Sequence, residues 1–258
     1  MVTHGSLYDY PRYYDIAHSA TTEAEGAFYR QVFDDRLNAF QTLLDVGCGS
    51  GRVMAELARM GIKCVGIDKN RTSVEYVNEK ARRESLDMTA ILSDITAPSI
   101  AGPYDAAICT GDTIKYIIDK RDLITHLKNV AAILNPGGLY AVDTSLVGPP
   151  EKYVGGAGEW TVVEGAVTVN GSFVAYAVDR TAKTERIRHQ LRVVDGTDEY
   201  VLTEDAIFHA LTFYDYEGIV EESRVFNIEC CVGGDYNPAN IITPDDETGD
   251  VVVLLRKI

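Results

Sequence analysis

The sequence has few cations for its length. Of its 258 residues, 24 are lysine or arginine and 39 are aspartate or glutamate, which gives a formal net charge of -15. An acidic surface of this kind repels the phosphates of nucleic acids and the headgroups of anionic lipids. We therefore expect no nucleic acid and no membrane among the partners of this protein.

Cysteine pairs and targeting segments are also missing. The five cysteines form no Cys-x-x-Cys pair, and an odd count without regular spacing predicts neither a disulfide framework nor a zinc site. The first twelve residues lack the basic and then apolar pattern of a signal peptide. Apolar runs such as 251–255 are far shorter than the roughly 20 residues of a membrane span. Together these absences predict a cytoplasmic protein with reduced thiols.

Short apolar segments alternate with helical ones between Thr42 and Ser145, which predicts a parallel α/β sheet. The helical segments show apolar faces, such as the one formed by Val53, Leu57 and Met60. Upstream, Thr22 and Glu25 have the spacing of a capping box. Strands covered on both sides by helices are expected at Thr42–Val46, Lys63–Ile67, Thr89–Leu92, Ala106–Cys109 and Leu139–Asp143.

The pattern changes after the fifth of these strands. A glycine- and proline-rich loop at 148–158 is followed by alternating residues typical of antiparallel strands, with Asn170-Gly171 and Asp195-Gly196 as candidate hairpin turns. A helix near 212–223 and two further strands then resume the α/β pattern. We expect one domain over residues 1–258, with an inserted antiparallel β subdomain over residues 155–211.

The most specific local feature is the glycine-rich run from Asp45 to Gly51 (DVGCGSG), which closes the first strand and opens the first helix. Glycines there let the backbone turn tightly and approach a ligand. A dinucleotide fingerprint needs a small residue three positions after Gly49, but Arg52 stands there. The Gly-Lys pair of a P-loop is absent as well. Both phosphate-binding interpretations are therefore disfavoured.

Acidic residues follow three successive strands. Asp45 ends the first strand, Asp68 ends the second and Asp94 follows the third, where open α/β sheets bind their ligands. The Asp68 carboxylate can accept hydrogen bonds from two ribose hydroxyls, and Asp94 can accept from an adenine amine. Asp45 suits a nearby ammonium or sulfonium and would repel a pyrophosphate. This pattern favours a cationic nucleoside ligand. Taken singly, each acid could also be a solvated strand end or a helix N-cap.

These motifs resemble those of class I S-adenosylmethionine (SAM)-dependent methyltransferases. The resemblance also covers Tyr104-Asp105 and the run from Leu134 to Gly138, and it holds in order over nearly the whole chain. It implies a Rossmann-like seven-stranded methyltransferase sheet whose last strand is antiparallel. It further implies a lid tyrosine over the cofactor, Tyr14 or Tyr13. The cofactor-binding residues that it implies are Tyr14, Asp45, Gly47, Cys48, Gly49, Gly51, Asp68, Lys69, Asp94, Ile95 and Thr110.

The acceptor is expected to be a small molecule. The inserted β segment resembles the substrate-covering sheet of small-molecule N-methyltransferases, which act on nucleotide-linked amino sugars or glycine-like amines. We expect this sheet and the loop at 148–158 to select the substrate. Asp112 and Tyr116 are candidates for the acceptor side, although Asp112 could instead cap a helix. A hydroxyl acceptor would need a general base more than an amine. His189, Asp143 and His209 are candidates that no spacing singles out.

In the segment around His189, alternation puts Ile187, His189 and Leu191 on one strand face and three arginines on the other. The histidine could simply be a core residue. The arginines could be solvated, or they could bind a phosphate-bearing substrate or an acidic partner. Apolar residues on both faces of Ser172–Val178 make a homodimer plausible. The alternatives kept open are a methyltransferase for protein or RNA, a non-catalytic SAM-binding regulatory module and a nicotinamide oxidoreductase.

Overall fold

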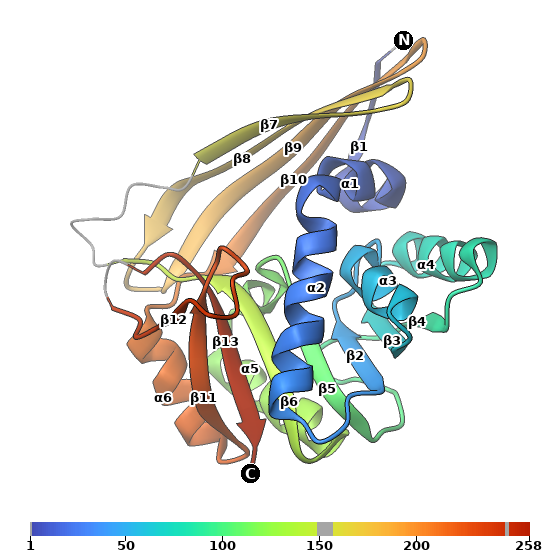
Figure 1. Ribbon diagram of the computed structural model, residues 1–258. Coiled ribbons are helices and arrows are strands. Elements are labelled where there is room, and N and C mark those ends of the chain that lie inside the picture. The colour runs from blue at the N-terminus through green and yellow to red at the C-terminus, as the bar shows by residue number, and fades with distance from the viewer. Residues whose placement is uncertain (1, 149–156, 246–247) are drawn as a thin grey trace.

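The computed structural model describes residues 2–148, 157–245 and 248–258. It contains two β-sheets (Figure 1). The larger sheet is covered by helices, and the second sheet consists mainly of long strands that extend away from it at the upper edge of the view. Most of the predicted loop at 148–158, and the first two residues of the predicted subdomain, lie outside the described residues.

The larger sheet has the strand order β12-β11-β13-β6-β5-β2-β3-β4. Strands β2 to β6 pair in parallel, whereas β13 runs antiparallel to both of its neighbours. Parallel pairing through helices explains why these strands are apolar on both faces. The strands are β2 (Thr42–Val46), β3 (Lys63–Asp68), β4 (Met88–Leu92), β5 (Tyr104–Cys109), β6 (Leu134–Ser145), β11 (Phe226–Gly233), β12 (Ile241–Ile242) and β13 (Asp250–Lys257).

Five strands therefore lie where the sequence predicts them, with ends that differ by a few residues. The sequence predicts seven strands in this sheet, whereas the described residues form eight. The additional strand is β12, whose two residues pair with Cys231 and Val232 on the edge strand β11. So short a strand lacks the alternation of apolar and polar residues by which a strand is recognised in a sequence.

Helices cover both faces of the larger sheet. Residues of α2, α3 and α4 form one buried cluster with the sheet, and residues of α5 and α6 form another on the opposite face. Among the described residues, no helix is long and apolar enough to cross a membrane. The helices are α1 (Pro11–Ala17), α2 (Ser19–Arg36), α3 (Arg52–Arg59), α4 (Arg71–Glu84), α5 (Lys120–Ala132) and α6 (Phe213–Ser223), with the 3-10 turns η1 (Leu7–Asp9) and η2 (Thr113–Tyr116).

The predicted capping box at the start of α2 is wrong. The helix begins at Ser19, so Thr22 lies within its first turn and its hydroxyl donates to the carbonyl of His18 at 2.8 Å. Glu25 does not reach back to the helix start. It accepts a hydrogen bond from the Arg52 guanidinium at 2.7 Å. Both side chains thus have partners that the local spacing does not reveal.

The second sheet has the order β1-β10-β9-β8-β7, with β1 parallel to β10 and the other pairs antiparallel. The N-terminal strand β1 was not predicted in this sheet. Helix α1 packs on this second sheet through a buried cluster that includes Leu7, Ile16 and Leu191. The strands are β1 (Val2–Ser6), β7 (Ala157–Glu164), β8 (Val167–Asp179), β9 (Thr184–Asp195) and β10 (Asp198–His209).

One of the two predicted hairpin turns in this sheet is correct. Gly196 lies between β9 and β10 with a φ of +63°. Asn170-Gly171, in contrast, lies inside β8, so the prediction of a turn there is wrong. Gly171 is needed for packing, because a Cβ at that position would lie 2.2 Å from the ring of Trp160. The turn between β7 and β8 is at Gly165 instead.

Candidate functional site

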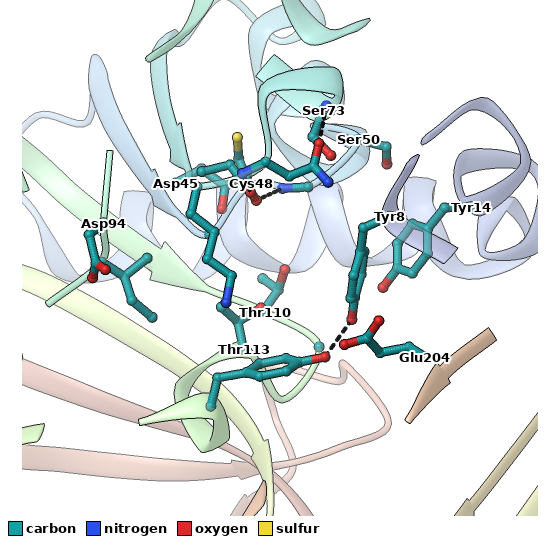
Figure 2. Close-up of a pocket in the computed structure, with 18 of the residues that line it drawn as sticks. Tyr8, Tyr14, Asp45, Cys48, Ser50, Ser73, Asp94, Thr110, Thr113 and Glu204 are labelled. Atoms are coloured by element: carbon teal, nitrogen blue, oxygen red, sulfur yellow. Dashed lines mark hydrogen bonds between the residues drawn. The ribbon is translucent and has the colours of Figure 1, made fainter. Parts of the chain in front are cut away.

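A cavity of about 670 Å³ opens between the carboxyl ends of strands β2 to β5 and the second sheet (Figure 2). Its size suits a small-molecule ligand. Gly51 is the one member of the predicted cofactor set that does not line it. The members of that set that do line it are Tyr14, Asp45, Gly47, Cys48, Gly49, Asp68, Lys69, Asp94, Ile95 and Thr110.

The glycine-rich loop forms one wall of the cavity. The amides of Gly47 and Cys48 donate to the carbonyl of Ile67 at 2.8 and 3.0 Å, which ties the loop to the end of β3. Gly47 has a φ of +76°, and a Cβ there would lie 2.3 Å from the Thr113 methyl carbon. Only glycine lets the loop and η2 approach this closely.

Gly51 has a different role from the rest of the loop. It is the N-cap of α3 with a φ of +67°, and a Cβ there would lie 2.9 Å from a methyl carbon of Val77. It therefore lets α3 pack closely on α4. The prediction that Gly51 binds the cofactor is not supported by its position.

Asp68 stands at the end of β3 and holds two backbone amides. Its carboxylate oxygens accept from the amide of Gly49 at 2.9 Å and from that of Asn70 at 2.7 Å. Each oxygen has a further lone pair, so the carboxylate can still accept hydrogen bonds from a ligand. The two amides fix the carboxylate in place before any ligand arrives.

Asp45 is the most buried acid of the cavity, with 2% of its surface exposed. Burial raises its pKa to about 7, with Asp68 adding to the effect and Arg52 opposing it. One of its oxygens, Oδ1, is buried without a hydrogen-bond partner among the described residues. A buried carboxylate without a partner is costly, so a cationic ligand group beside Asp45 would relieve it.

Asp94 lies on the loop after β4. Its Oδ1 accepts from both the amide and the hydroxyl of Thr96 at 2.7 Å, and these hydrogen bonds lower its pKa. The other oxygen is free to accept from a ligand. Asp45, Asp68 and Asp94 therefore meet at one cavity, as expected for acids at adjacent parallel strand ends.

Of the two candidate lid tyrosines, Tyr14 lines the cavity and Tyr13 does not. Tyr14 on α1 lines the cavity, and its hydroxyl lies near Gly111. Tyr13 points to the second sheet instead, where its hydroxyl donates to Asp195 at 3.1 Å. Of the two tyrosines that the resemblance allows, the structure brings only Tyr14 to the cavity.

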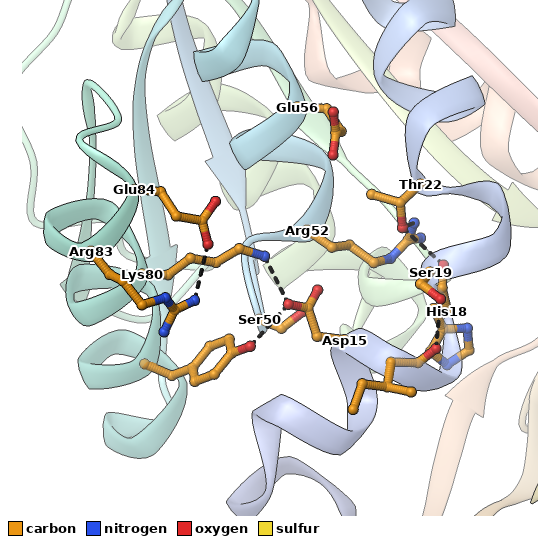
Figure 3. A network of polar contacts seen from close by, with 12 residues as sticks. Asp15, His18, Ser19, Thr22, Ser50, Arg52, Glu56, Lys80, Arg83 and Glu84 are labelled. Atoms are coloured by element: carbon orange, nitrogen blue, oxygen red, sulfur yellow. Dashed lines mark hydrogen bonds and ion pairs between the residues drawn. The ribbon is translucent and has the colours of Figure 1, made fainter. Parts of the chain in front are cut away.

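Ion pairs hold α1 against α4 and α2 against α3 (Figure 3). Lys80 on α4 lies 2.7 Å from Asp15 on α1, and the Tyr76 hydroxyl donates to the same carboxylate at 2.9 Å. Arg52 at the start of α3 pairs with Glu25 on α2 at 2.7 Å. These contacts fix the helix that carries Tyr14.

Of the predicted acceptor-side residues, only Tyr116 lines the cavity. The Asp112 carboxylate points away and accepts from the amide and hydroxyl of Ser145 at 2.7 and 2.8 Å. It makes no cap hydrogen bond for η2 either. His189 packs among aromatic rings, and burial lowers its pKa to about 4. The structure therefore does not bring Asp112 or His189 to the cavity, because other contacts hold their side chains.

The other two candidate bases have partners outside the cavity. Asp143 accepts a hydrogen bond from the Tyr236 hydroxyl at 2.8 Å, and burial raises its pKa to about 7. His209 contacts the carbonyl of Ile117 at 2.9 Å. Neither residue lines the cavity.

Many cavity residues were not predicted as site residues, and Ser6, Tyr8, Asp122 and Glu204 are among them. Tyr8 lies in η1, just before the helix that carries Tyr14, and its hydroxyl contacts that of Tyr116 at 2.8 Å. Glu204 comes from β10, about 135 residues further along the chain than the cavity residue Lys69, which follows β3. No local signal identifies it, since alternation along a strand does not say which face covers a ligand. No group of three or more potential metal ligands occurs among the described residues.

The fold and the cavity define an α/β protein that binds a nucleoside ligand of cationic character at its strand ends. Residues 43–138 match the family described as "Methyltransferase domain". The dTDP-4-amino-2,3,4,6-tetradeoxy-D-glucose N,N-dimethyltransferase of Saccharopolyspora spinosa is 26% identical over 223 residues, which cover 84% of this chain and 85% of that protein.

Solved structures share the fold. A S-adenosylmethionine-dependent methyltransferase from Clostridium acetobutylicum ATCC 824 has a TM-score of 0.74 at 20% identity and covers 90% of each chain. SAM-bound CalS10, an amino pentose methyltransferase from Micromonospora echinaspora, has a TM-score of 0.70 at 17% identity and covers 92% of each chain. Residues 43–138 of this chain therefore form a methyltransferase domain, and the chain is similar over most of its length to SAM-dependent methyltransferases, with SAM as the cofactor that these matches indicate.

Proposed function

We propose that this enzyme transfers the methyl group of SAM to an amine nitrogen of a small molecule inside the described cavity. The observation that carries the proposal is the meeting of Asp45, Asp68 and Asp94 at one cavity, with a buried Asp45 oxygen that lacks a partner. The named relatives from Saccharopolyspora and Micromonospora support a sugar amine as the type of acceptor.

The cavity residues fit SAM group by group. Asp68 has free lone pairs for the two ribose hydroxyls, and Asp94 has a free oxygen for the adenine amine. Asp45 offers its unpartnered oxygen to the cationic methionine part, and Thr110 and Tyr14 line the same end. The Tyr14 ring can add a cation–π contact to a sulfonium.

The protein has little chemistry to supply beyond positioning. Bound SAM provides a methyl group that is already activated by its sulfonium. Transfer forms a C–N bond as the C–S bond breaks, and the acceptor nitrogen loses one proton to water. Holding the two reactants in line supplies most of the rate enhancement. No general base is required for an amine, which agrees with the absence of Asp143, His189 and His209 from the cavity.

The second sheet restricts which acceptors can enter. Ser6 of β1 and Glu204 of β10 line the cavity opposite the glycine-rich loop. We propose that residues 155–211 form a substrate-covering subdomain of a single methyltransferase domain over residues 1–258. A covered acidic cavity favours a small molecule over a folded protein or an RNA. A homodimer stays a prediction.

The test is an assay of S-adenosylhomocysteine (SAH) formation with three sets of acceptors, namely amino sugars, small aliphatic amines and phenols. We expect turnover with amines and none with phenols. Turnover of phenols alone would overturn nitrogen as the acceptor atom. SAH binding without transfer to any of the three sets would favour the regulatory module instead.

A further inference from the structure

Tyr8 and Glu204 lie at the end of the cavity remote from Asp94 (Figure 2), and Tyr116 lines the cavity in contact with Tyr8. The two phenol oxygens lie 2.8 Å apart, and burial raises the pKa of both groups, so both are neutral at physiological pH. Glu204 is half-buried beside them, and burial raises its pKa somewhat. This end therefore offers one carboxylate framed by two aromatic rings, with the Lys69 ammonium close enough to oppose the rise in the pKa of Glu204.

The charge of the cavity lining is strongly negative. Among the described residues, the cations of the lining are Arg52 and Lys69, and Arg52 is already paired with Glu25 at 2.7 Å. Lys69 is exposed and lies 5.6 Å from the centroid of the Tyr116 ring. The carboxylates of the lining are Asp45, Asp68, Asp94, Asp119, Asp122 and Glu204. A phosphate group in this cavity would meet repulsion from most sides.

Two of the helix N-termini at the cavity, those of α4 and α5, do not offset this charge, whereas the N-terminus of α3, beside the glycine-rich loop, has no side-chain cap. Helix N-termini bind phosphates through their free amides. At the start of α5, the Asp119 side chain accepts from the amide of Arg121 at 2.7 Å, and Asp122 adds a carboxylate to the first turn. At the start of α4, the Asn70 side chain accepts from the amide of Ser73 at 3.1 Å. Side chains of the protein therefore already accept hydrogen bonds from amides at the N-termini of α4 and α5.

The arginines of β9 cannot supply the missing positive charge either. Glu204 pairs with His189 in the register of β9 and β10, so these two side chains share the face that is turned to the cavity. Arg188 pairs with Asp205 on the opposite face, where the two side chains form an ion pair at 2.7 Å. The sequence-based alternative that these arginines bind a phosphate-bearing substrate is therefore wrong for this cavity.

We propose that the acceptor is a small amine that carries no phosphate, and that Glu204 binds its ammonium form at the Tyr8–Tyr116 end of the cavity, where the nitrogen loses one proton to water before its lone pair attacks the methyl group. This inference rests on the proposed function and narrows its substrate class. It departs from the nucleotide-linked amino sugar in the name of the Saccharopolyspora relative. An acidic lining raises the local concentration of a cationic amine and lowers that of a nucleotide diphosphate.

Titration calorimetry on the SAH-saturated enzyme tests the inference with two probes. One is methyl 4-amino-4,6-dideoxy-α-D-glucopyranoside, and the other is the same amino sugar linked to thymidine diphosphate. We expect the glycoside to bind at least about 10-fold more tightly than the nucleotide-linked sugar. Glu204→Gln should weaken glycoside binding about 10-fold or more, because a hydrogen bond between charged groups is lost. Glu204→Asp should restore part of the affinity.

Glu199→Gln is the matched control, since Glu199 lies on the same strand, is exposed and does not line the cavity. Unchanged SAH affinity in each variant shows that it is folded. Equal or tighter binding of the nucleotide-linked sugar would overturn the inference, as would failure of both probes to bind or an unaltered Glu204→Gln variant. In all three cases SAH binding would leave the proposed function standing. Loss of SAH binding by the wild type would instead overturn the proposed function.

Discussion

The two ends of the cavity are built in different ways. At the cofactor end, the side chains follow consecutive parallel strands, and backbone amides already hold them, as for Asp68. At the acceptor end, Ser6, Tyr8, Tyr116 and Glu204 come from four separate elements, β1, η1, η2 and β10. The first end depends on local chain geometry, whereas the second depends on how two sheets are placed against each other.

The largest effect is expected at the cofactor end from Gly47→Ala. The positive φ and the contact with Thr113 both oppose a Cβ, which should lower the free energy of unfolding by about 3 kcal/mol and SAH affinity by about 100-fold. Thermal unfolding and calorimetry measure the two effects. Gly61→Ala is the control, since Gly61 has a φ of +85° but nothing within 4 Å of an added Cβ. Equal losses of stability and SAH affinity in the two variants would show that the positive φ alone causes them and that the contact with Thr113 contributes nothing.

A second test concerns the ion pair between α1 and α4, which holds the helix that carries Tyr14. Lys80→Met leaves the Asp15 carboxylate, whose side chain is 18% exposed, without its cation. We expect the free energy of unfolding to fall by about 2 kcal/mol, because a partly buried carboxylate loses its cation. The affinity for SAH should also fall, because α1 carries Tyr14, which lines the cavity. Arg83→Met on the same helix removes an exposed pair and should change little. If both variants behave alike, α1 does not depend on this pair.

The protonation of Asp45 should make SAM binding at the cofactor end depend on pH. The folded state keeps a proton on Asp45 up to about pH 7, whereas the unfolded chain loses it near pH 4, so its contribution to stability falls as the pH rises between these values. A cationic ligand favours the ionised form, so SAM affinity should rise about 10-fold from pH 6 to pH 7.5. Calorimetry in both buffers measures this rise, and Asp45→Asn should abolish it. A rise that persists in the variant would assign it to another group.

The smallest effect is expected from His189→Phe. The ring lies outside the cavity among other aromatic side chains, and its Nε2 is buried without a partner among the described residues. Replacing it by an apolar ring of similar size should change stability by less than about 1 kcal/mol. Turnover should be unaltered in a steady-state assay. A fall in kcat would restore His189 as a catalytic candidate.

The contrast between the two ends also explains what the sequence predicts. Asp45, Asp68 and Asp94 each follow a recognisable strand, and parallel strand ends meet at one edge, so their proximity follows from local pattern alone. Gly51 was included in the cofactor set but does not line the cavity, because a glycine for helix packing looks the same in a sequence as a glycine for ligand contact.

The acceptor end could not be predicted in this way. The pairing of β1 with β10 joins segments almost 200 residues apart, and only that pairing brings Ser6 near Glu204. The Asp112 side chain turns to Ser145 because a long-range hydrogen bond holds it, which the spacing within η2 does not reveal. Similarly, Gly171 was interpreted as a turn residue, whereas it lies within β8 and makes room for the Trp160 ring of the neighbouring strand, a contact that the local sequence does not reveal.

The most direct test of the account is calorimetric titration of SAH into the wild type, Asp68→Ala and the exposed control Asp87→Ala. We expect binding to the wild type and the control, and a loss of about 100-fold in Asp68→Ala, because two hydrogen bonds to a carboxylate and the fixed loop are removed. No binding to the wild type would contradict the cofactor site altogether. Equal binding to all three proteins would contradict the position assigned to the ribose.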